Sequence, residues 1–231
     1  MSNIKQRLDQ VLDQIHQAEK KYQRPPGSVT LLAVSKTWPL EHILDAAAAG
    51  QTCFGENYVQ ESVAKIDSCT EQLEWHFIGH LQSNKSREIA SRFDWVHSVD
   101  RLKLAKRLSQ QRPDNLAPLN ICLQVNISNE PNKSGFSASE IAMAAEQIKQ
   151  LPRLKLRGLM AIPAPSQDIE QQRTAFHQVA MLQQQLIDQG MTPDTLSMGM
   201  SGDMEAAIAE GATIVRVGTA IFGQRHYPGR P

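Results

Sequence analysis

The sequence lacks the features that mark most secreted, membrane-spanning and zinc-binding proteins. Its three cysteines, Cys53, Cys69 and Cys122, stand apart and form no CxxC pair, so we expect neither a disulfide framework nor a zinc site. No apolar run approaches the about 18 residues that cross a bilayer. The first residues are charged where a signal peptide would be apolar. We therefore expect a cytoplasmic protein without a membrane or metal partner.

An excess of one charge is also missing. The chain carries 24 basic and 24 acidic side chains, whereas proteins that bind nucleic acid usually present a basic surface. No nucleic-acid partner is expected. Common catalytic signatures are missing as well. The sequence has no HExxH, GxSxG, GxGxxG or P-loop motif, and no pair of carboxylates spaced for glycosidase chemistry.

The 231 residues instead show strand-like apolar runs that alternate with amphipathic helices. The first run, residues 29–34, is apolar on both faces, as are the strands of buried parallel sheets. Further strands are expected at residues 52–55, 75–79, 95–99, 119–126, 154–161, 195–198 and 212–217. Eight strands with helices between them predict an α/β fold, a single (β/α)8 TIM barrel over residues 1–231. A doubly wound open sheet is the alternative.

An extra helix is expected before the first strand, where apolar residues recur on one helical face. These residues are Ile4, Leu8, Val11, Leu12 and Ile15. Helices between the strands are predicted at residues 39–49, 83–92, 168–189 and 202–210, among others. Their predicted starts include Ser83 and Asp100 as N-caps, and Ser137 with Glu140 as a capping box.

Lys36 directly follows the first strand, where a barrel of this kind places its chemistry. A lysine held at such a strand end loses solvation, and its amine becomes a usable nucleophile; a solvated lysine is the alternative. Two glycine-bearing turns, residues 197–205 and 216–220, follow the last two strands. The loops after strands 7 and 8 of such barrels frequently bind phosphate, although ordinary capping by Ser201 and a tight turn at Gly218 would also explain them.

An amine and a phosphate seat across one barrel mouth indicate pyridoxal 5′-phosphate (PLP). Lys36 would form a Schiff base with this cofactor, and the two turns would hold its phosphate. Arg216, on the last strand, is placed to reach the pyridine nitrogen and keep it unprotonated. A buried ion pair is the alternative role for this arginine.

Seven segments of the chain are distinctive. They are LLAVSKTWP, FGENYVQE, WHFIGHLQSNK, VNISNEPNKSG, RGLMAIPAP, LSMGMSGDMEAAI and RVGTAIFG. Together they resemble the YggS/PROSC family, the pyridoxal phosphate homeostasis proteins, over nearly the whole chain. The resemblance implies a single (β/α)8 barrel similar to the N-terminal domain of alanine racemase, with PLP on Lys36.

The same resemblance implies further cofactor contacts. The phosphate would be held by Ser201, Gly202, Gly218 and Thr219. Asn57 and Arg216 match positions near the cofactor. Lys133 matches a family lysine suggested to influence cofactor handling, with a solvated loop lysine as the alternative. His80 departs from the commoner proline of the family and is assigned no role.

The resemblance favours a PLP carrier that buffers the cofactor and passes it transiently to apo-enzymes. Alanine racemases use a tyrosine from an additional domain as a second base, and this chain has only Tyr22, Tyr58 and Tyr227. We therefore expect no enzymatic turnover, and the neutral surface and the complete barrel favour a monomer. One alternative is a weak single-domain amino-acid racemase that uses Tyr58 or a cysteine as its second acid. Another is a barrel that binds a different phosphorylated metabolite without a Schiff base.

Overall fold

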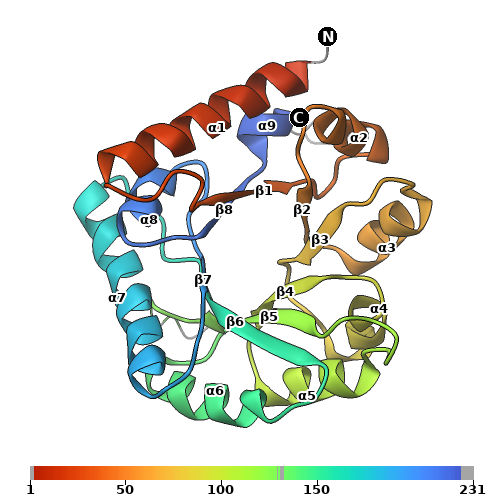
Figure 1. The fold of residues 1–231 in the computed structure, drawn as a ribbon, viewed down its shortest axis with the longest axis vertical. Coiled ribbons are helices and arrows are strands. Elements are labelled where there is room, and N and C mark those ends of the chain that lie inside the picture. The colour runs from red at the N-terminus through yellow and green to blue at the C-terminus, as the bar shows by residue number, and fades with distance from the viewer. Residues whose placement is uncertain (1–2, 129, 131–132, 225–231) are drawn as a thin grey trace.

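Eight parallel strands form the centre of the molecule and close into a barrel (Figure 1). The structure is a computed structural model that describes residues 3–128, 130 and 133–224. Each strand pairs with the next in sequence, and the last pairs with the first. The strands are β1 (Thr30–Val34), β2 (Cys53–Glu56), β3 (Glu74–Phe77), β4 (Trp95–Val99), β5 (Leu119–Val125), β6 (Leu154–Ala161), β7 (Thr195–Ser197) and β8 (Ile214–Val217). The predicted (β/α)8 barrel is confirmed, and the open sheet is wrong.

Helices surround the barrel as an outer ring (Figure 1). They are α1 (Asn3–Lys21), α2 (Leu40–Ala48), α3 (Val59–Ser68), α4 (Ser86–Ala90), α5 (Leu102–Gln111), α6 (Ile141–Lys149), α7 (Ile169–Asp188), α8 (Met204–Ala209) and α9 (Thr219–Phe222), with the short 3-10 helices η1 (Ser83–Lys85) and η2 (Ala138–Glu140). Among these described helices, even α1 and α7, of 19 and 20 residues, lack an apolar stretch able to cross a bilayer.

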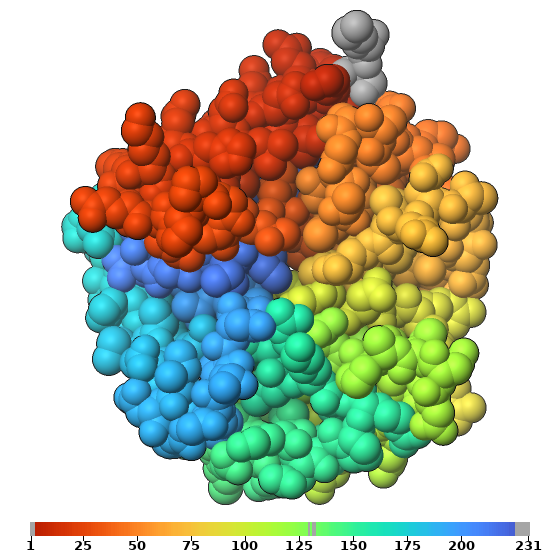
Figure 2. Space-filling view, viewed as in Figure 1, coloured from red at the N-terminus to blue at the C-terminus, as the bar shows by residue number. Residues whose placement is uncertain are grey.

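The first helix, α1, is the predicted addition to the barrel. Its buried face carries Ile4, Leu8, Val11 and Ile15, as the sequence pattern predicts. The helix packs against α2, α8 and α9, so the early and late parts of the described chain lie side by side, seen as the red and blue surfaces of Figure 2. It therefore covers the part of the barrel where β8 meets β1.

The two faces of each strand pack against different partners because successive side chains alternate. In β1, Leu31 and Ala33 belong to the large apolar core that includes the inward faces of the helices. A separate cluster of Trp95, Cys122 and Met160 comes from β4, β5 and β6. Burial raises the pKa of the Cys122 thiol to about 12, so this cysteine stays protonated within the barrel.

Two of the predicted helix caps are wrong, and both side chains bond Arg101. Arg101 itself occupies the N-cap position of α5, and its guanidinium is paired with the Asp100 carboxylate at 2.5 Å. The same guanidinium donates to the hydroxyl of Ser83 over 3.2 Å, and Ser83 is the first residue of η1 and not its cap. The capping box of Ser137 and Glu140 is confirmed, although the helix it starts is the 3-10 turn η2.

Gly158 of β6 occupies a position where only glycine fits. Its φ is +154°, and a Cβ there would lie 1.9 Å from the carbonyl oxygen of Thr195 on β7. We expect Gly158→Ala to lower the free energy of unfolding by about 3 kcal/mol, because the two strands must part locally. Urea denaturation measures this. Gly202→Ala, where the added Cβ meets open space, is the control, and equal effects of the two variants would contradict the prediction.

Candidate functional site

The carboxyl ends of β7, β8, β1 and β2 are neighbours, because the barrel is closed. Lys36 stands two residues beyond the end of β1 and is half-buried. Gly218 directly follows β8, and a Cβ on it would lie 3.0 Å from the carbonyl oxygen of Val34. The turn after β8 is therefore packed against the strand end that leads to Lys36.

The turn after β7 is hydrogen-bonded to β8, the strand that leads to the Gly218 turn. The backbone N–H of Arg216 donates to the carbonyl oxygen of Gly199 over 2.9 Å. Ser201 and Gly202 are exposed, and the carboxylate of Asp203 accepts the backbone N–H of Met200 over 2.6 Å. Asp203, and not Ser201, is the N-cap residue of α8. The alternative reading, in which Ser201 caps this helix, is therefore wrong.

Two short helices begin at this rim. The helix α8 starts after the Ser201–Gly202 turn, and α9 starts at Thr219 with Gly218 as its N-cap residue. The first N–H groups of a helix have no acceptor within the helix. Backbone donors therefore gather at the rim between Lys36 and the two glycine-bearing turns.

Arg216 lies within the barrel just below these turns. Its Nη1 donates to the carbonyl oxygen and the hydroxyl of Ser197, over 2.5 and 2.9 Å, and its Nη2 donates to the carbonyl oxygen of Ala161 over 2.9 Å. Ser197 and Ala161 are the last residues of β7 and β6, which places the guanidinium near the carboxyl end. Burial lowers the pKa of Arg216 to about 10, so it is still a cation at neutral pH.

A buried polar network holds the turn that carries Lys36. The hydroxyl of Ser35 donates to the Glu56 carboxylate over 2.6 Å, and Lys65 of α3 donates to the same oxygen over 2.8 Å. Lys65 also donates to the carbonyl oxygen of Ser35 over 3.0 Å and to Glu61 over 2.5 Å. Glu61 accepts the backbone N–H of Thr37 over 2.6 Å. The residues on both sides of Lys36 are thus fixed by β2 and α3.

Thr37 shows how closely this turn is defined. Its φ is +67°, in the left-handed region that residues other than glycine rarely adopt. The bond to Glu61 gives that backbone N–H a charged acceptor. Burial raises the pKa of Glu56, and the charge of Lys65 and the bonds from Lys65 and Ser35 oppose that rise. The ion pair with Lys65 therefore offsets part of the cost of burying the Glu56 carboxylate beside this turn.

Asn57 follows β2 and continues the rim on the other side of Lys36. Its side-chain Oδ1 is buried and finds no hydrogen-bond partner among the residues that the structure describes. The backbone of Asn57 packs against Gly79 after β3, where an added Cβ would lie 2.1 Å from its carbonyl oxygen. A cleft of about 490 Å³ opens beside it, lined by residues that include Tyr58, Glu61 and His80.

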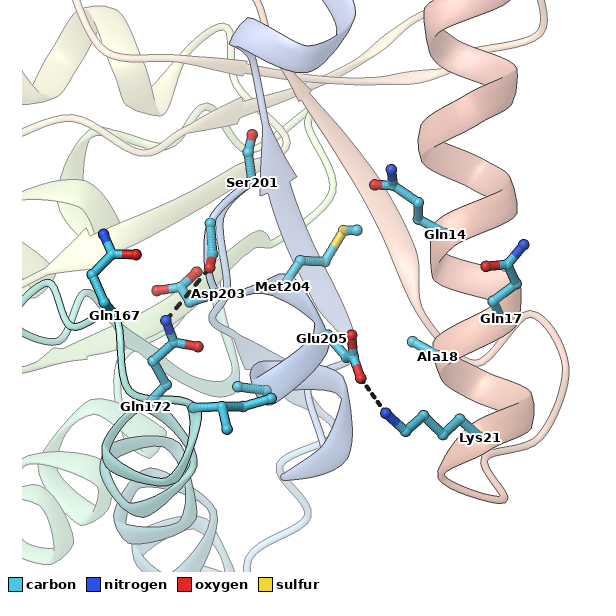
Figure 3. Close-up of a pocket in the computed structure, with 13 residues that line it drawn as sticks. Gln14, Gln17, Ala18, Lys21, Gln167, Gln172, Ser201, Asp203, Met204 and Glu205 are labelled. Atoms are coloured by element: carbon cyan, nitrogen blue, oxygen red, sulfur yellow. Dashed lines mark hydrogen bonds and ion pairs between the residues drawn. The ribbon is translucent and has the colours of Figure 1, made fainter.

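A second cleft of about 500 Å³ runs outside the rim, between α1, α8 and the start of α7 (Figure 3). It meets the rim only at the turn of Ser201 and Gly202, and Lys36 is not among its lining residues. The ion pair of Lys21 and Glu205 bridges its far side over 2.7 Å. This cleft therefore borders the candidate site at one turn but does not include Lys36.

The other residues singled out from the sequence lie away from Lys36 or at the surface. Lys133 forms an ion pair with Glu130 over 2.6 Å, and both side chains are partly exposed. His80 is exposed and lies 3.8 Å from the Asp100 carboxylate. The hydroxyl of Tyr22 donates to Glu205 on the outer cleft. Tyr58 is 53% exposed, and Tyr227 lies outside the described residues.

Comparison with known proteins identifies the family. Residues 6–226 match the family model described as alanine racemase, N-terminal domain. The pyridoxal phosphate homeostasis protein of Vibrio alginolyticus is 55% identical, over 98% of this chain and 100% of its own length. The chain belongs to the pyridoxal phosphate homeostasis family. The resemblance drawn from the seven sequence segments is confirmed.

Solved structures of similar fold include close and distant relatives of this chain. PipY of Synechococcus elongatus is 39% identical, with TM-scores of 0.84 for its structure without PLP and 0.82 with PLP bound, and 96% of this chain covers 100% of PipY. An alanine racemase of Clostridium difficile is 13% identical with a TM-score of 0.69, and it shares the fold. The match covers 94% of this chain and 57% of that racemase chain.

Sequence reasoning missed two sets of buried residues. Lys65 is spaced four residues from Glu61, which is typical of a solvated helix pair, yet Lys65 is 7% exposed. His76 and His97 lie in apolar strands, and their contact with each other becomes visible only when β3 and β4 are paired. A signal existed for the histidines, since polar residues inside buried strands need partners.

The buried ion pair gives a stability prediction. We expect Lys65→Met to lower the free energy of unfolding by about 3–5 kcal/mol, because it leaves Glu56 buried without a cation. The pKa of Glu56 is raised in the folded state, so the folded protein loses stability as pH rises through that pKa and the carboxylate ionises. The stability lost in Lys65→Met, measured by urea denaturation, should therefore be smaller at pH 5 than at pH 8.

The control for this prediction is Lys85→Met. Lys85 forms an ion pair of 3.4 Å with Glu88 at the surface, and such pairs contribute at most about 1 kcal/mol. A Lys65→Met protein as stable as Lys85→Met, at both pH values, would show that the network does not hold the turn.

Proposed function

We propose that this chain binds PLP covalently through Lys36 and keeps the cofactor available without catalytic turnover. The observation that carries the proposal is the packing of the Gly218 turn against Val34, two residues before Lys36. It brings an amine and an anion seat to one rim. The PLP-bound structure of the relative PipY, at 39% identity, supports the cofactor.

The residues at the rim fit this cofactor. When bound, PLP supplies an aldehyde that condenses with a lysine amine and releases water. Lys36 offers that amine from a turn fixed by Glu56, Glu61 and Lys65. The backbone around Gly202 has open space where a side chain would stand, which suits the close approach of a phosphate to main-chain N–H groups.

We expect Arg216 to meet the pyridine nitrogen, and its contacts with the last residues of β6 and β7, near the rim, support this role. Three of its N–H groups donate to oxygens of Ser197 and Ala161, and an arginine has five such donors. A cation held there disfavours protonation of the ring nitrogen and so weakens the ring as an electron sink. This supports a role in holding PLP more than a role in carbanion chemistry.

The lack of turnover is also part of the proposal. The relatives at 52–55% identity are named homeostasis proteins, while the racemases share only the fold. Of the described tyrosines, Tyr22 bonds Glu205 on the outer cleft and Tyr58 points to an exposed surface. That the chain acts as a monomer and passes PLP to apo-enzymes stays a prediction.

The first experiment locates the covalent bond. The purified protein, incubated with PLP, should be yellow, and borohydride reduction should fix one PLP on the peptide that contains Lys36, as seen by mass spectrometry. Lys36→Ala should lose both the colour and the adduct. Lys85→Ala, which removes a lysine after β3, should keep them. A wild-type protein that takes up no PLP, or an adduct that persists in Lys36→Ala, would refute the proposal.

The phosphate seat is tested with a matched pair at Thr219, the exposed first residue of α9. Thr219→Glu adds a carboxylate beside the anion, whereas Thr219→Gln adds a neutral group of the same shape. We expect the Glu variant to bind PLP at least about tenfold more weakly than the Gln variant. Fluorescence titration measures both affinities, and equal values would remove Thr219 from the phosphate site.

Turnover is tested by exchange of the α-proton of alanine in deuterated water, followed by NMR. We expect exchange no faster than that of free PLP with the amino acid. Exchange at an enzyme-like rate that disappears in Lys36→Ala would support a racemase instead.

A further inference from the structure

A line of hydrogen-bonded side chains crosses the interior of the barrel. It starts at Glu74, whose carboxylate lies 2.7 Å from Nε2 of His76. Nδ1 of His76 lies 2.8 Å from Nε2 of His97, and Nδ1 of His97 lies 2.7 Å from the hydroxyl of Ser197. That hydroxyl accepts from Arg216 over 2.9 Å. We call these five residues the relay.

The relay connects the two mouths of the barrel. His97 is on β4 and Ser197 is on β7, which are not neighbours in the barrel, so their contact must cross its interior. Glu74 begins β3 at the amino-terminal mouth and is 46% exposed, whereas Arg216 lies near the carboxyl-terminal rim. The three residues between them are at most 1% exposed, so solvent does not interrupt the line.

Both ends of the relay have a fixed polarity. The hydrogen bond from His76 lowers the pKa of Glu74, which is therefore an ionised acceptor at neutral pH. Arg216 at the other end can only donate. Burial lowers the pKa of both histidines, that of His97 well below its usual value. Each imidazole is therefore neutral and has one N–H and one lone pair.

These conditions leave a single order of protons. The carboxylate of Glu74 requires an N–H on Nε2 of His76, so Nδ1 of His76 must accept. Nε2 of His97 must then donate to it, so Nδ1 of His97 accepts in turn. Ser197 must donate its only hydroxyl proton to His97, and its lone pair remains for Arg216. Every hydrogen bond of the relay thus points from Arg216 towards Glu74.

We infer that His76, His97 and Ser197 are positioning residues that hold the guanidinium of Arg216 through this one-way order of hydrogen bonds, anchored by Glu74 at the opposite mouth. Ser197 cannot turn its proton towards Arg216, so the arginine meets acceptors only on this side. Its Nε–H and one Nη2–H are outside the three bonds formed with Ser197 and Ala161. The role towards PLP rests on the proposed function, whereas the order of protons does not.

The proton order is tested on the protein without added PLP. Long-range ¹H–¹⁵N NMR at pH 7 distinguishes the two neutral forms of histidine and the imidazolium. We expect His76 and His97 both to carry their proton on Nε2. Assignment comes from His76→Gln and His97→Gln, each of which removes one set of signals. An imidazolium, or a proton on Nδ1 of either histidine, would overturn the inference.

A metal ion at the amino-terminal mouth would be the competing explanation for Glu74 and His76. The possible ligand atoms of Cys53, Glu74 and His76 lie within 4.8 Å of one another. A metal would need the lone pair of Nε2 on His76, which the relay occupies with a proton. We therefore expect equimolar Zn²⁺ to leave the histidine signals unchanged, and tight binding with loss of the Nε2 proton would contradict the relay.

The effect on the cofactor is tested with Ser197→Ala, which cuts the relay beside Arg216 and leaves the backbone oxygen in place. We expect about fivefold weaker PLP binding and a changed pH profile of the PLP absorbance. Met160→Leu, a conservative swap of a buried barrel residue, should change neither.

A double-mutant cycle shows whether Ser197 acts through Arg216. In an Arg216→Lys background, Ser197→Ala should weaken PLP binding by less than about twofold, because the group that it positions is gone. A full fivefold loss in that background would show that Ser197 acts on PLP or on packing without Arg216. Should the wild-type protein bind no PLP, the proposed function fails and the NMR result alone decides the relay.

Discussion

The pairing of β8 with β1 is the constraint on which the candidate site depends. Four residue pairs, from Thr30 with Ile214 to Ala33 with Val217, join the last strand to the first. Lys36 and Gly218 are far apart in the sequence, and this pairing is what brings them to the same part of the barrel. Because β-strands in a parallel barrel all run the same way, closure brings their carboxyl ends to one rim. The helix α1 covers the same junction and buries its apolar face there.

Much of this arrangement could be predicted from the sequence, because it depends on local patterns. Apolar runs with flanking turns place all eight strands, and the glycines after β7 and β8 indicate where backbone N–H groups are left open. The caps at Ser83 and Asp100 were predicted wrongly for a physical reason. Arg101 bonds both side chains, and its contact with Ser83, 18 residues away in the sequence, leaves no periodic signal.

The partners of the buried polar groups are the part that could not be predicted from the sequence. Lys65 has the spacing of a surface residue, and His76 and His97 stand in strands that otherwise read as apolar core. Their meaning depends on which strands and helices become neighbours in three dimensions. Once β2, β3, β4 and α3 are in place, most of these groups find partners. Few other arrangements of strands and helices would satisfy these networks, since each buried polar group left unpaired would lower the stability of the fold.

The three acceptors around Lys65 have a chemical consequence for the rim. An ammonium group has three N–H donors, and Lys65 directs them to Ser35, Glu56 and Glu61. All three donors are therefore engaged by oxygens around the turn, although Lys65 itself belongs to α3 and bonds the turn at Ser35, the residue before Lys36. The fold thereby gives the two lysines different tasks: Lys65, which is 7% exposed, holds the turn from within, and the turn carries the half-buried Lys36 beyond the end of β1.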